Sequence, residues 1–447
     1  MMRPLPFWRD RRGGVAFLTA LWAVPALIGV AAAVNYGLCI ESRSRLNAMA
    51  DAATLAVVST GKISEPAAQA GSDAETLFRS AAATLPGVTI TSVDVSVSST
   101  DSSTTTVKRV ATLRYSAAFP LLMGGFLGMP SLSLTGMSEA TGSTPANIDF
   151  YLLVDTSPSM AFPATSTGMD AMLAATKSQS SGNGCAFACH QTTTSATNPG
   201  GTPLDSASGK YLDNYQIAIN QGISLRIDVI RSAITDLIQT VSASGGKNAA
   251  TYRMAISTFD YSYSPVSAVT GDTDTLTQAA QQIELLAVCS NNARVCGVSN
   301  SDMDTNFTAA FAGESDSLPA MSGTGTNNSG DTPQVVLFLL TDGMRDENVS
   351  GGRALGAIPV ALCEDLKQNR NIRIAVLYTQ YLVDDLQTNA WSVSHVMSFL
   401  SPTDTLEENL QSCASPGLFY EVTTNDDVST ALQTLFQRTL ATAHLTQ

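Results

Sequence analysis

Oxygen-bearing side chains directly follow two apolar runs of this chain, and their types and order suit a bound cation. Asp155, Ser157 and Ser159 follow the first run, and Asp342 follows the second, 334–341. Runs of this kind are typical of buried strands. The loops after the carboxyl ends of parallel strands meet at one edge of a sheet, which would bring these side chains together. Because hard divalent cations bind carboxylate and hydroxyl oxygens, the pattern predicts a metal site.

The elements that must position these side chains alternate between strand and helix from residue 147 onward. Apolar and alternating runs predict strands at 147–155, 252–259, 265–270, 334–341, 372–379 and 418–422. Amphipathic periodicity predicts helices at 211–241, 273–287, 353–368 and 426–442. This alternation implies an α/β fold with a doubly wound, mostly parallel sheet flanked by helices. A Ser/Thr/Gly-rich insertion, 161–210, separates the first strand from the first helix.

The motif Asp155-Thr-Ser-Pro-Ser159 is similar to the D-x-S-x-S motif of the von Willebrand factor A (vWA) domain. The resemblance covers about residues 147–443 and includes Leu339-Leu-Thr-Asp-Gly343 after the later strand. It also identifies the loop threonine of the family as Thr305, within Asp304-Thr-Asn-Phe-Thr-Ala-Ala-Phe. The resemblance implies a metal-ion-dependent adhesion site (MIDAS) for Mg²⁺, or alternatively Mn²⁺ or Ca²⁺. Its expected ligands are Asp155, Ser157, Ser159, Thr305 and Asp342.

The expected ligand set contains two carboxylates, Asp155 and Asp342, and three neutral hydroxyls, so an octahedral cation keeps a position for a further oxygen. An Asp or Glu of a partner could then complete the coordination sphere, which favours docking over catalysis. Asp304 stands where the family usually has Gly, and it adds a carboxylate near the site. The alternative without a metal is that the loop hydroxyls cap a helix while Asp342 forms a turn.

A membrane anchor is expected near the N-terminus, because no charged residue occurs between Arg12 and Glu41. As a helix these 28 residues would span about 42 Å, enough to cross a hydrocarbon core of about 30 Å. Basic residues before the run predict a single pass through the inner (cytoplasmic) membrane, with the N-terminus in the cytoplasm. The alternative is a signal peptide cleaved at Ala31-Ala32-Ala33. The length of the run favours retention, with membrane contact through residues 13–40.

The N-terminal sequence resembles that of Tad-type (tight-adherence, Flp) pilus-assembly proteins. The similarity lies in Arg11-Arg-Gly-Gly-Val-Ala-Phe, the apolar helix, and Arg43-Ser-Arg-Leu-Asn-Ala-Met-Ala-Asp-Ala-Ala-Thr-Leu-Ala. The sequence around Cys363 and Cys413 also resembles the ending of TadG-like proteins. These resemblances imply a pilin-like anchor in residues 1–60. A single-span anchor of another kind is the simpler alternative.

The segment between anchor and vWA domain, 61–143, is expected to form a small α+β module. One helix is predicted at 66–85, and alternating patterns predict strands at 88–97, 105–115 and 131–136. A short linker is expected at 142–147, before the vWA domain that extends over 147–443.

Six cysteines lie beyond the anchor, and an even set in an exported body indicates three disulfides in an oxidising compartment. Fifteen connectivities are open to six cysteines. Proximity along the chain suggests the pairs Cys185–Cys189, Cys289–Cys296 and Cys363–Cys413.

Charge and motif content narrow the possible functions. Residues 1–45 carry a net +4 and the remainder −18, so an acidic body argues against nucleic acid as a partner. The sequence has no recognisable nucleophile–base motif, so an enzyme is not expected. We expect a Tad/Flp-type pilus-assembly or adhesion protein that binds other pilus proteins, or a surface ligand with an exposed Asp or Glu. The alternative is a membrane-anchored periplasmic scaffold of a secretion complex in which the metal is only structural.

Overall fold

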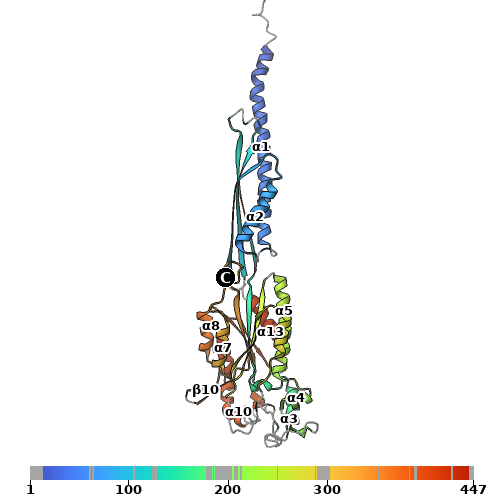
Figure 1. Ribbon diagram of the computed structural model, residues 1–447, viewed down its shortest axis with the longest axis vertical. Helices are drawn as coiled ribbons and strands as arrows, with labels where there is room; N and C mark the ends of the chain where they lie inside the picture. The colour runs from blue at the N-terminus through green and yellow to red at the C-terminus, as the bar shows by residue number, and fades with distance from the viewer. Residues whose placement is uncertain are drawn as a thin grey trace, which may run out of the picture. The chain divides into compact units, whose positions relative to one another are not determined.

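The chain forms two compact units in a computed structural model (Figure 1). The first comprises residues 1–100, 108–143 and 327–329, and the second comprises 101–107, 144–326 and 330–447. The structure describes residues 14–59, 62, 65–103, 106–122, 124, 128–177, 184, 186, 204–205, 210–211, 214–248, 250–286, 288, 303–350, 352–381, 383–386, 390–423 and 426–441.

The first unit packs two helices on one sheet. Its described elements are α1 (Gly14–Val58), α2 (Ala67–Ala82), β1 (Thr89–Ser103), β2 (Thr106–Pro120) and β3 (Ser131–Pro145), with strand order β1-β2-β3. The expected helix and strands are present, but each strand is longer than its alternating pattern predicted. The linker expected at 142–147 was wrong, because β3 continues to Pro145.

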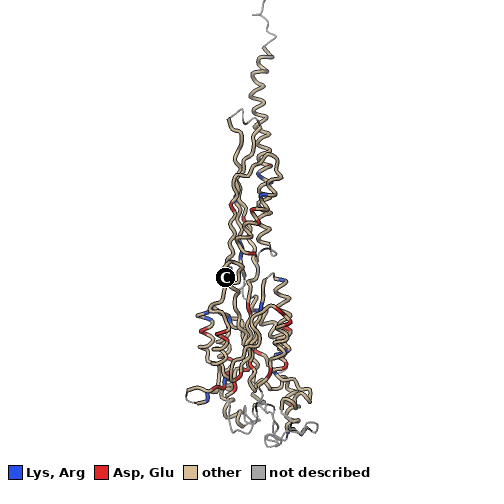
Figure 2. Tube along the Cα trace, in the orientation of Figure 1, with Lys and Arg blue, Asp and Glu red and all other residues tan. Residues whose placement is uncertain are grey.

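The apolar segment and the Ala-rich segment after it form one continuous helix, α1, of 45 residues. In the second half of α1, Leu46, Ala50, Ala53 and Val57 recur at helical spacing and are buried against the rest of the unit. The small alanines allow α1 and α2 to approach closely. The first half is exposed, and Figure 2 shows no charged position along it. Among the described helices, α1 alone is long and apolar enough to cross a membrane.

The second unit is built on a mixed sheet, and the predicted α/β fold class, a mostly parallel sheet flanked by helices, is confirmed. Within the described residues six strands follow the order β13-β12-β9-β4-β7-β8, and every neighbouring pair is parallel except β7 and β8. The strands are β4 (Ile148–Asp155), β7 (Tyr252–Phe259), β8 (Tyr263–Thr270), β9 (Gln334–Thr341), β12 (Arg373–Thr379) and β13 (Phe419–Val422).

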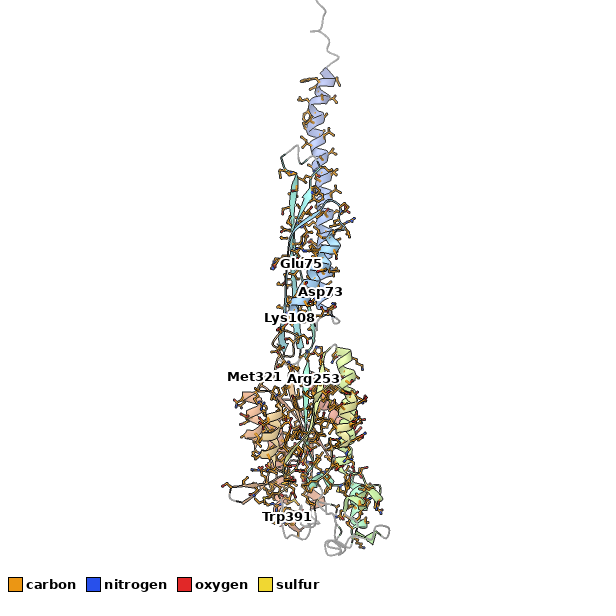
Figure 3. All side chains as sticks on the ribbon, in the orientation of Figure 1. Asp73, Glu75, Lys108, Arg253, Met321 and Trp391 are labelled. Atoms are coloured by element: carbon orange, nitrogen blue, oxygen red, sulfur yellow. A yellow bond between two sulfur atoms is a disulfide. The ribbon has the colours of Figure 1, made fainter. Side chains whose placement is uncertain are left out.

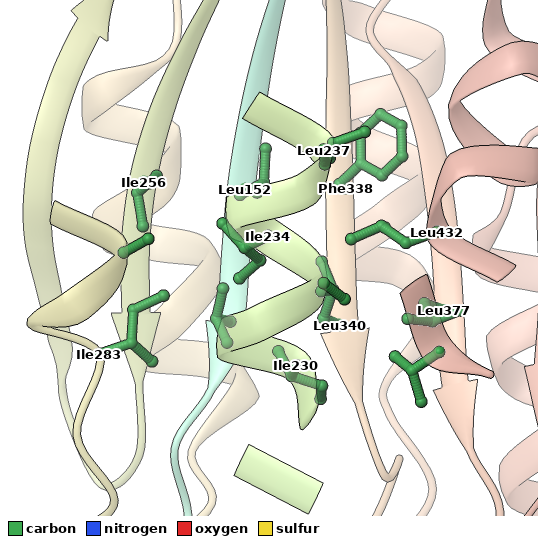
Figure 4. Close-up of a cluster of buried hydrophobic side chains, with 14 of the residues drawn as sticks. Leu152, Ile230, Ile234, Leu237, Ile256, Ile283, Phe338, Leu340, Leu377 and Leu432 are labelled. Atoms are coloured by element: carbon green, nitrogen blue, oxygen red, sulfur yellow. The ribbon is translucent and has the colours of Figure 1, made fainter. Parts of the chain in front are cut away.

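Helices cover both faces of this sheet, because alternate side chains of each strand point to opposite faces. On β4, Leu152 belongs to one buried cluster and Leu153 to the other. One face is covered by α5 (Arg226–Asn248), α6 (Thr273–Gln281) and α13 (Val428–Ala441); in Figure 4, Ile234 of α5 lies over Leu152 and Leu340. The other face is covered by α7 (Phe307–Ser317), α8 (Val360–Asn369) and α12 (Thr405–Cys413).

Several predicted helices have different bounds. The helix expected at 211–241 is divided into α4 (Asn214–Asn220) and α5, and the one expected at 273–287 ends at Gln281. The helix expected at 353–368 was wrong in its first part. There β10 (Arg345–Val349) and β11 (Gly352–Gly356) form a hairpin, and the helix begins only after Pro359. The turn uses Gly352 with φ near +125°, a conformation that favours glycine.

Shorter elements complete the second unit. They are η2 (Pro158–Ala161), α3 (Ser166–Ala175), β5 (Leu204–Asp205), β6 (Lys210–Tyr211), α9 (Val383–Leu386), α10 (Ala390–His395) and α11 (Met397–Leu400). No helix was predicted between the strands β12 and β13, where the structure has α9 to α12. The insertion 161–210 contains α3, β5 and part of β6.

One expected disulfide is present among the described cysteines. Cys363 of α8 and Cys413 of α12 are bonded, with a Cα–Cα distance of 5.2 Å, and both are fully buried. The bond therefore joins two helices on one face of the sheet. The other two expected pairs, Cys185–Cys189 and Cys289–Cys296, lie outside the described residues.

Candidate metal centre

Asp155 ends β4 and lies fully buried between two loops. Its Oδ1 accepts a 2.9 Å hydrogen bond from the backbone N–H of Ser157. This is an Asx turn, in which the side chain of an Asp accepts from the amide two residues later. The Oδ2 of Asp155 accepts a 2.6 Å hydrogen bond from the hydroxyl of Thr341, at the end of the neighbouring strand β9. These two bonds fix the carboxylate at the carboxyl edge of the sheet.

Ser157 and Ser159 bring their hydroxyls together in the loop after β4. The two Oγ atoms are 3.0 Å apart. Ser157 precedes η2, but its side chain makes no capping hydrogen bond. Its hydroxyl therefore does not cap this helix, as the alternative without a metal would require. Pro158 starts this turn with its φ already restricted. The loop thus presents two neutral oxygens beside Asp155.

Asp342 lies at the same edge, directly after β9, because β4 and β9 pair in parallel with Val154 opposite Leu340. Its Oδ1 accepts from the N–H of Met344 at 3.2 Å, and its Oδ2 accepts from the hydroxyl of Tyr381 at 2.7 Å. The turn depends on Gly343, whose φ is +80° and whose missing Cβ would lie 2.8 Å from a methyl carbon of Leu410. Asp342 therefore does form a turn, as the alternative without a metal required.

The two carboxylates repel each other in a buried environment. Burial raises the pKa of Asp155 to about 7, and the nearby charge of Asp342 adds to the shift. Burial also raises the pKa of Asp342, whereas Arg226, Ser159 and Tyr381 lower it. Two buried carboxyls within electrostatic reach of each other are stabilised in their ionised form by a cation between them.

Thr305 is held at this edge through its backbone. It forms an antiparallel bridge with Asp346, with N–H to carbonyl bonds of 3.0 and 2.9 Å. The next residue, Asn306, caps α7 by accepting from the N–H of Ala309 at 2.9 Å. Thr305 is 5 % exposed. Hydrogen bonds thus connect Asp155 with Ser157, and Ser157 with Ser159. Thr305 instead pairs with Asp346, which follows Asp342 along the chain.

Asp304, the departure from the family pattern, is buried beside a cation. Arg353 of β11 forms a bidentate ion pair with Asp346, and the pKa of its guanidinium is raised by Asp346 and, to a smaller extent, by Asp304. Arg353 therefore balances part of the acidic charge that Asp304 adds near the site.

Sequence reasoning missed Arg226, the first residue of α5. Arg226 is 5 % exposed, and its guanidinium carbon lies over two aromatic rings, 4.7 Å from the centroid of Phe162 and 5.3 Å from that of Tyr381. It donates to the carbonyl of Gln380, and its charge lowers the pKa of Asp342. No sequence signal marked it, because the helix was predicted to run from 211 to 241 and Arg226 stands inside that range.

The donor set fits a hard cation of the Mg²⁺ type, which accepts carboxylates, hydroxyls and water. Among the described residues no group of three or more His, Cys, Asp or Glu side chains is arranged to hold a metal. Metal ligation by Asp155, Ser157, Ser159, Thr305 and Asp342 stays a prediction.

No family model matches the chain, and no curated protein matches it either. Among solved structures, the vWF domain of the type V pili tip protein Mfa5 from Porphyromonas gingivalis is 9% identical, with a TM-score of 0.36, and covers 68% of this chain and 98% of that one. The PilB minor pilin from Streptococcus sanguinis is 11% identical, with a TM-score of 0.33 and 78% of each chain covered.

A third solved structure is proximal thread matrix protein 1 from the mussel byssus, with a zinc-occupied MIDAS motif. It is 11% identical, with a TM-score of 0.30, and covers 66% of this chain and 47% of that one. At such identities and TM-scores these similarities carry no functional argument. The function must be argued from the residues of the candidate site.

Proposed function

We propose that the second unit binds a divalent cation, Mg²⁺ in the first instance, through Asp155, Ser157, Ser159, Thr305 and Asp342. The observation that carries the proposal is the convergence of two buried carboxylates and a serine pair, from strands far apart in sequence, at one edge of the sheet. Two carboxylates balance the formal charge of a dication, but the proposed ligand set of two carboxylates and three neutral hydroxyls leaves one position of an octahedral cation for another oxygen. A carboxylate of another protein can bind there, so the site acts in adhesion or docking and not in catalysis.

In the proposed biological setting, the chain is an anchored pilus-assembly or adhesion protein of the Tad/Flp type. The support is the length and exposed apolar surface of α1 together with the resemblance of its sequence to Tad-type anchors. The basic residues before the helix favour a cytoplasmic N-terminus and an extracytoplasmic body. The buried Cys363–Cys413 disulfide supports an oxidising compartment for the body. A pilus component, or a surface ligand with an exposed Asp or Glu, is the proposed partner.

A second candidate is a scaffold whose metal is only structural. It is favoured by the burial of the site, because Asp155, Ser157 and Asp342 are fully buried and only Ser159 is partly exposed. In this case the cation would stabilise the loops after β4 and β9 without contacting a partner.

Calorimetric titration of Mg²⁺ and Mn²⁺ into the purified full-length protein tests the proposal. We expect saturable binding that is lost in Asp155→Asn and Asp342→Asn, because each removes a negative ligand, and retained in Asp94→Asn, which changes an exposed carboxylate of β1. Absence of binding by the folded wild-type protein would overturn the proposal. Binding to an acidic peptide that requires the metal distinguishes docking from the structural alternative, in which the metal changes only the unfolding temperature.

A further inference from the structure

Leu122, in the connection between β2 and β3, lies against the apolar half of α1. Asn35 of α1 clamps Leu122 of the loop with two hydrogen bonds: the N–H of Leu122 donates to Asn35 Oδ1 at 2.7 Å, and Asn35 Nδ2 donates to the Leu122 carbonyl at 3.0 Å. Ile28, Ala31, Asn35 and Cys39 form a stripe at helical spacing that is partly covered, whereas their neighbours are exposed. Figure 1 shows β2 and β3 running alongside α1.

This contact lies within the segment that carries no charge. Asn35 precedes Glu41, the next charged residue, by six positions, or about 9 Å along the helix. The charge-free run of about 42 Å is roughly 12 Å longer than a hydrocarbon core. The last turns of the run, with Asn35 among them, are therefore expected in the outer interfacial layer of the bilayer. The loop reaches the same level.

The side chains of the described loop residues suit lipid. Leu122 is 52 % exposed and Met129 is 57 % exposed, and Leu132 at the start of β3 is also exposed. From residue 115 to residue 138 the sequence contains no Asp, Glu, Lys, Arg or His. Exposed apolar side chains gathered beside a charge-free helix are unfavourable in water and favourable against acyl chains.

The backbone of the loop is also prepared for a medium without water. The N–H of Leu121 donates to the carbonyl of Pro130 at 3.0 Å, that of Gly124 to Leu121 at 3.0 Å, and that of Met129 to Gly124 at 2.9 Å. Asn35 satisfies both backbone groups of Leu122. Non-helical backbone enters a membrane only where its polar groups have partners in the protein, and the backbone groups of Leu121, Leu122 and Gly124 have such partners.

We propose that Leu122 and Met129, in the described part of the connection between β2 and β3, insert into the outer interface of the membrane as a second contact beside α1. The inference rests on the anchor in the proposed function. Lipid is the partner of these side chains, because Leu122 is hydrogen-bonded to a helix long enough to span a bilayer. The exposed apolar side chains lie where that helix is expected to enter the outer interface. Two contacts at one interface restrict the tilt and rotation of the helix.

Tryptophan fluorescence in nanodiscs that each hold one full-length chain tests this inference. The native tryptophans are first removed by W8F, W22F and W391F, and one reporter is introduced by L122W or by M129W. We expect blue-shifted emission that lipids with brominated acyl chains quench. The matched control is L77W, at a residue of α2 that is 44 % exposed and far along the chain from the loop, where no quenching is expected.

Each outcome decides the proposal. Solvent-like emission without quenching would show that the loop lies in water, and a blue shift without quenching would show that protein covers it; both overturn the inference. Sedimentation of the wild-type chain with phosphatidylcholine vesicles after a high-salt wash tests the anchor separately. A chain that stays in the supernatant overturns the anchor and the loop together, whereas a chain that sediments without quenching overturns only the loop.

Discussion

Tyr381 donates a 2.7 Å hydrogen bond from its buried hydroxyl to Asp342, on the same ring that faces the guanidinium of Arg226. The carboxylate thus has a neutral donor and a fixed cation as neighbours before any metal is considered. Burial and the charge of Asp342 both raise the pKa of Tyr381, so this hydroxyl keeps its proton and remains a donor. The arrangement stabilises a charge that would otherwise be costly to bury.

Y381F is expected to destabilise the metal-free protein by about 1–3 kcal/mol, because it removes a hydrogen bond to a buried charged group. The cost should fall in saturating Mg²⁺, because the cation then stabilises the same carboxylate. Urea denaturation with and without Mg²⁺ measures both values. Y263F is the control, since that hydroxyl contacts Ser257 and Ser317 and its cost should not depend on metal.

R226M is expected to increase Mg²⁺ affinity about tenfold, because a buried positive charge near Asp342 repels the cation by an amount on the order of 1–2 kcal/mol. Methionine keeps apolar contact with Phe162 and Tyr381. Calorimetric titration gives the affinity. R231M, at the next turn of α5, is the matched control and should leave affinity unchanged; equal affinities in wild type and R226M would contradict the expected repulsion.

Glu314 predicts a dependence of stability on pH. It is fully buried on α7, and burial raises its pKa from an ordinary 4.5 to about 7, with the hydroxyls of Ser257 and Tyr263 acting in the opposite direction. Between pH 4.5 and 7 the carboxyl of Glu314 is therefore protonated in the folded protein and ionised in the unfolded chain. Stability from this group is present below that window and falls as pH rises through it, by at most about 3 kcal/mol.

E314Q removes this titration, so its free energy of unfolding relative to wild type should rise from pH 5 to pH 8. Denaturant melts at several pH values measure the difference. E284Q, at an exposed position, should follow the wild-type profile. Parallel profiles for wild type and E314Q would show that Glu314 does not carry the expected proton.

The double variant C363A/C413A is expected to lose about 4 kcal/mol of stability, because the disulfide closes a loop with a sequence separation of 50 residues. Thermal unfolding of the second unit measures the loss. C39A changes a cysteine that is free in the structure and should not alter that transition. A loss similar in size to that of C39A would mean that the bond adds little beyond the packing of α8 on α12.

The strands around the candidate site could be predicted almost to the residue. In β4 and β9 every side chain is buried, so composition alone marks them, and the acid that follows each run marks its end. The segment 353–368 was harder, because Gly352 to Gly356 forms a half-buried hairpin strand and only the part after Pro359 is helical. The pattern of polar and apolar residues within a short segment does not show whether that segment pairs with another strand.

The site itself could be predicted only where its residues follow a motif. Asp155 and Asp342 stand at strand ends, which sequence marks, whereas Arg226 and Tyr381 reach the site by packing across elements far apart in the chain. Their roles depend on which aromatic ring lies over which charge. That information exists only after α5 has packed on the sheet.

The position of β4 has a mechanical consequence. The strand pairs along its whole length with β7 on one side and along all but its last residue with β9 on the other, and the candidate site lies at its carboxyl end. A pulling force between a ligand held at Asp155 and the chain that enters at Ile148 acts along the strand axis. It would load the hydrogen bonds of both ladders together in shear, so no single bond would have to break first. If the proposed function holds, resistance to traction would follow from the position of the candidate residues at the end of β4.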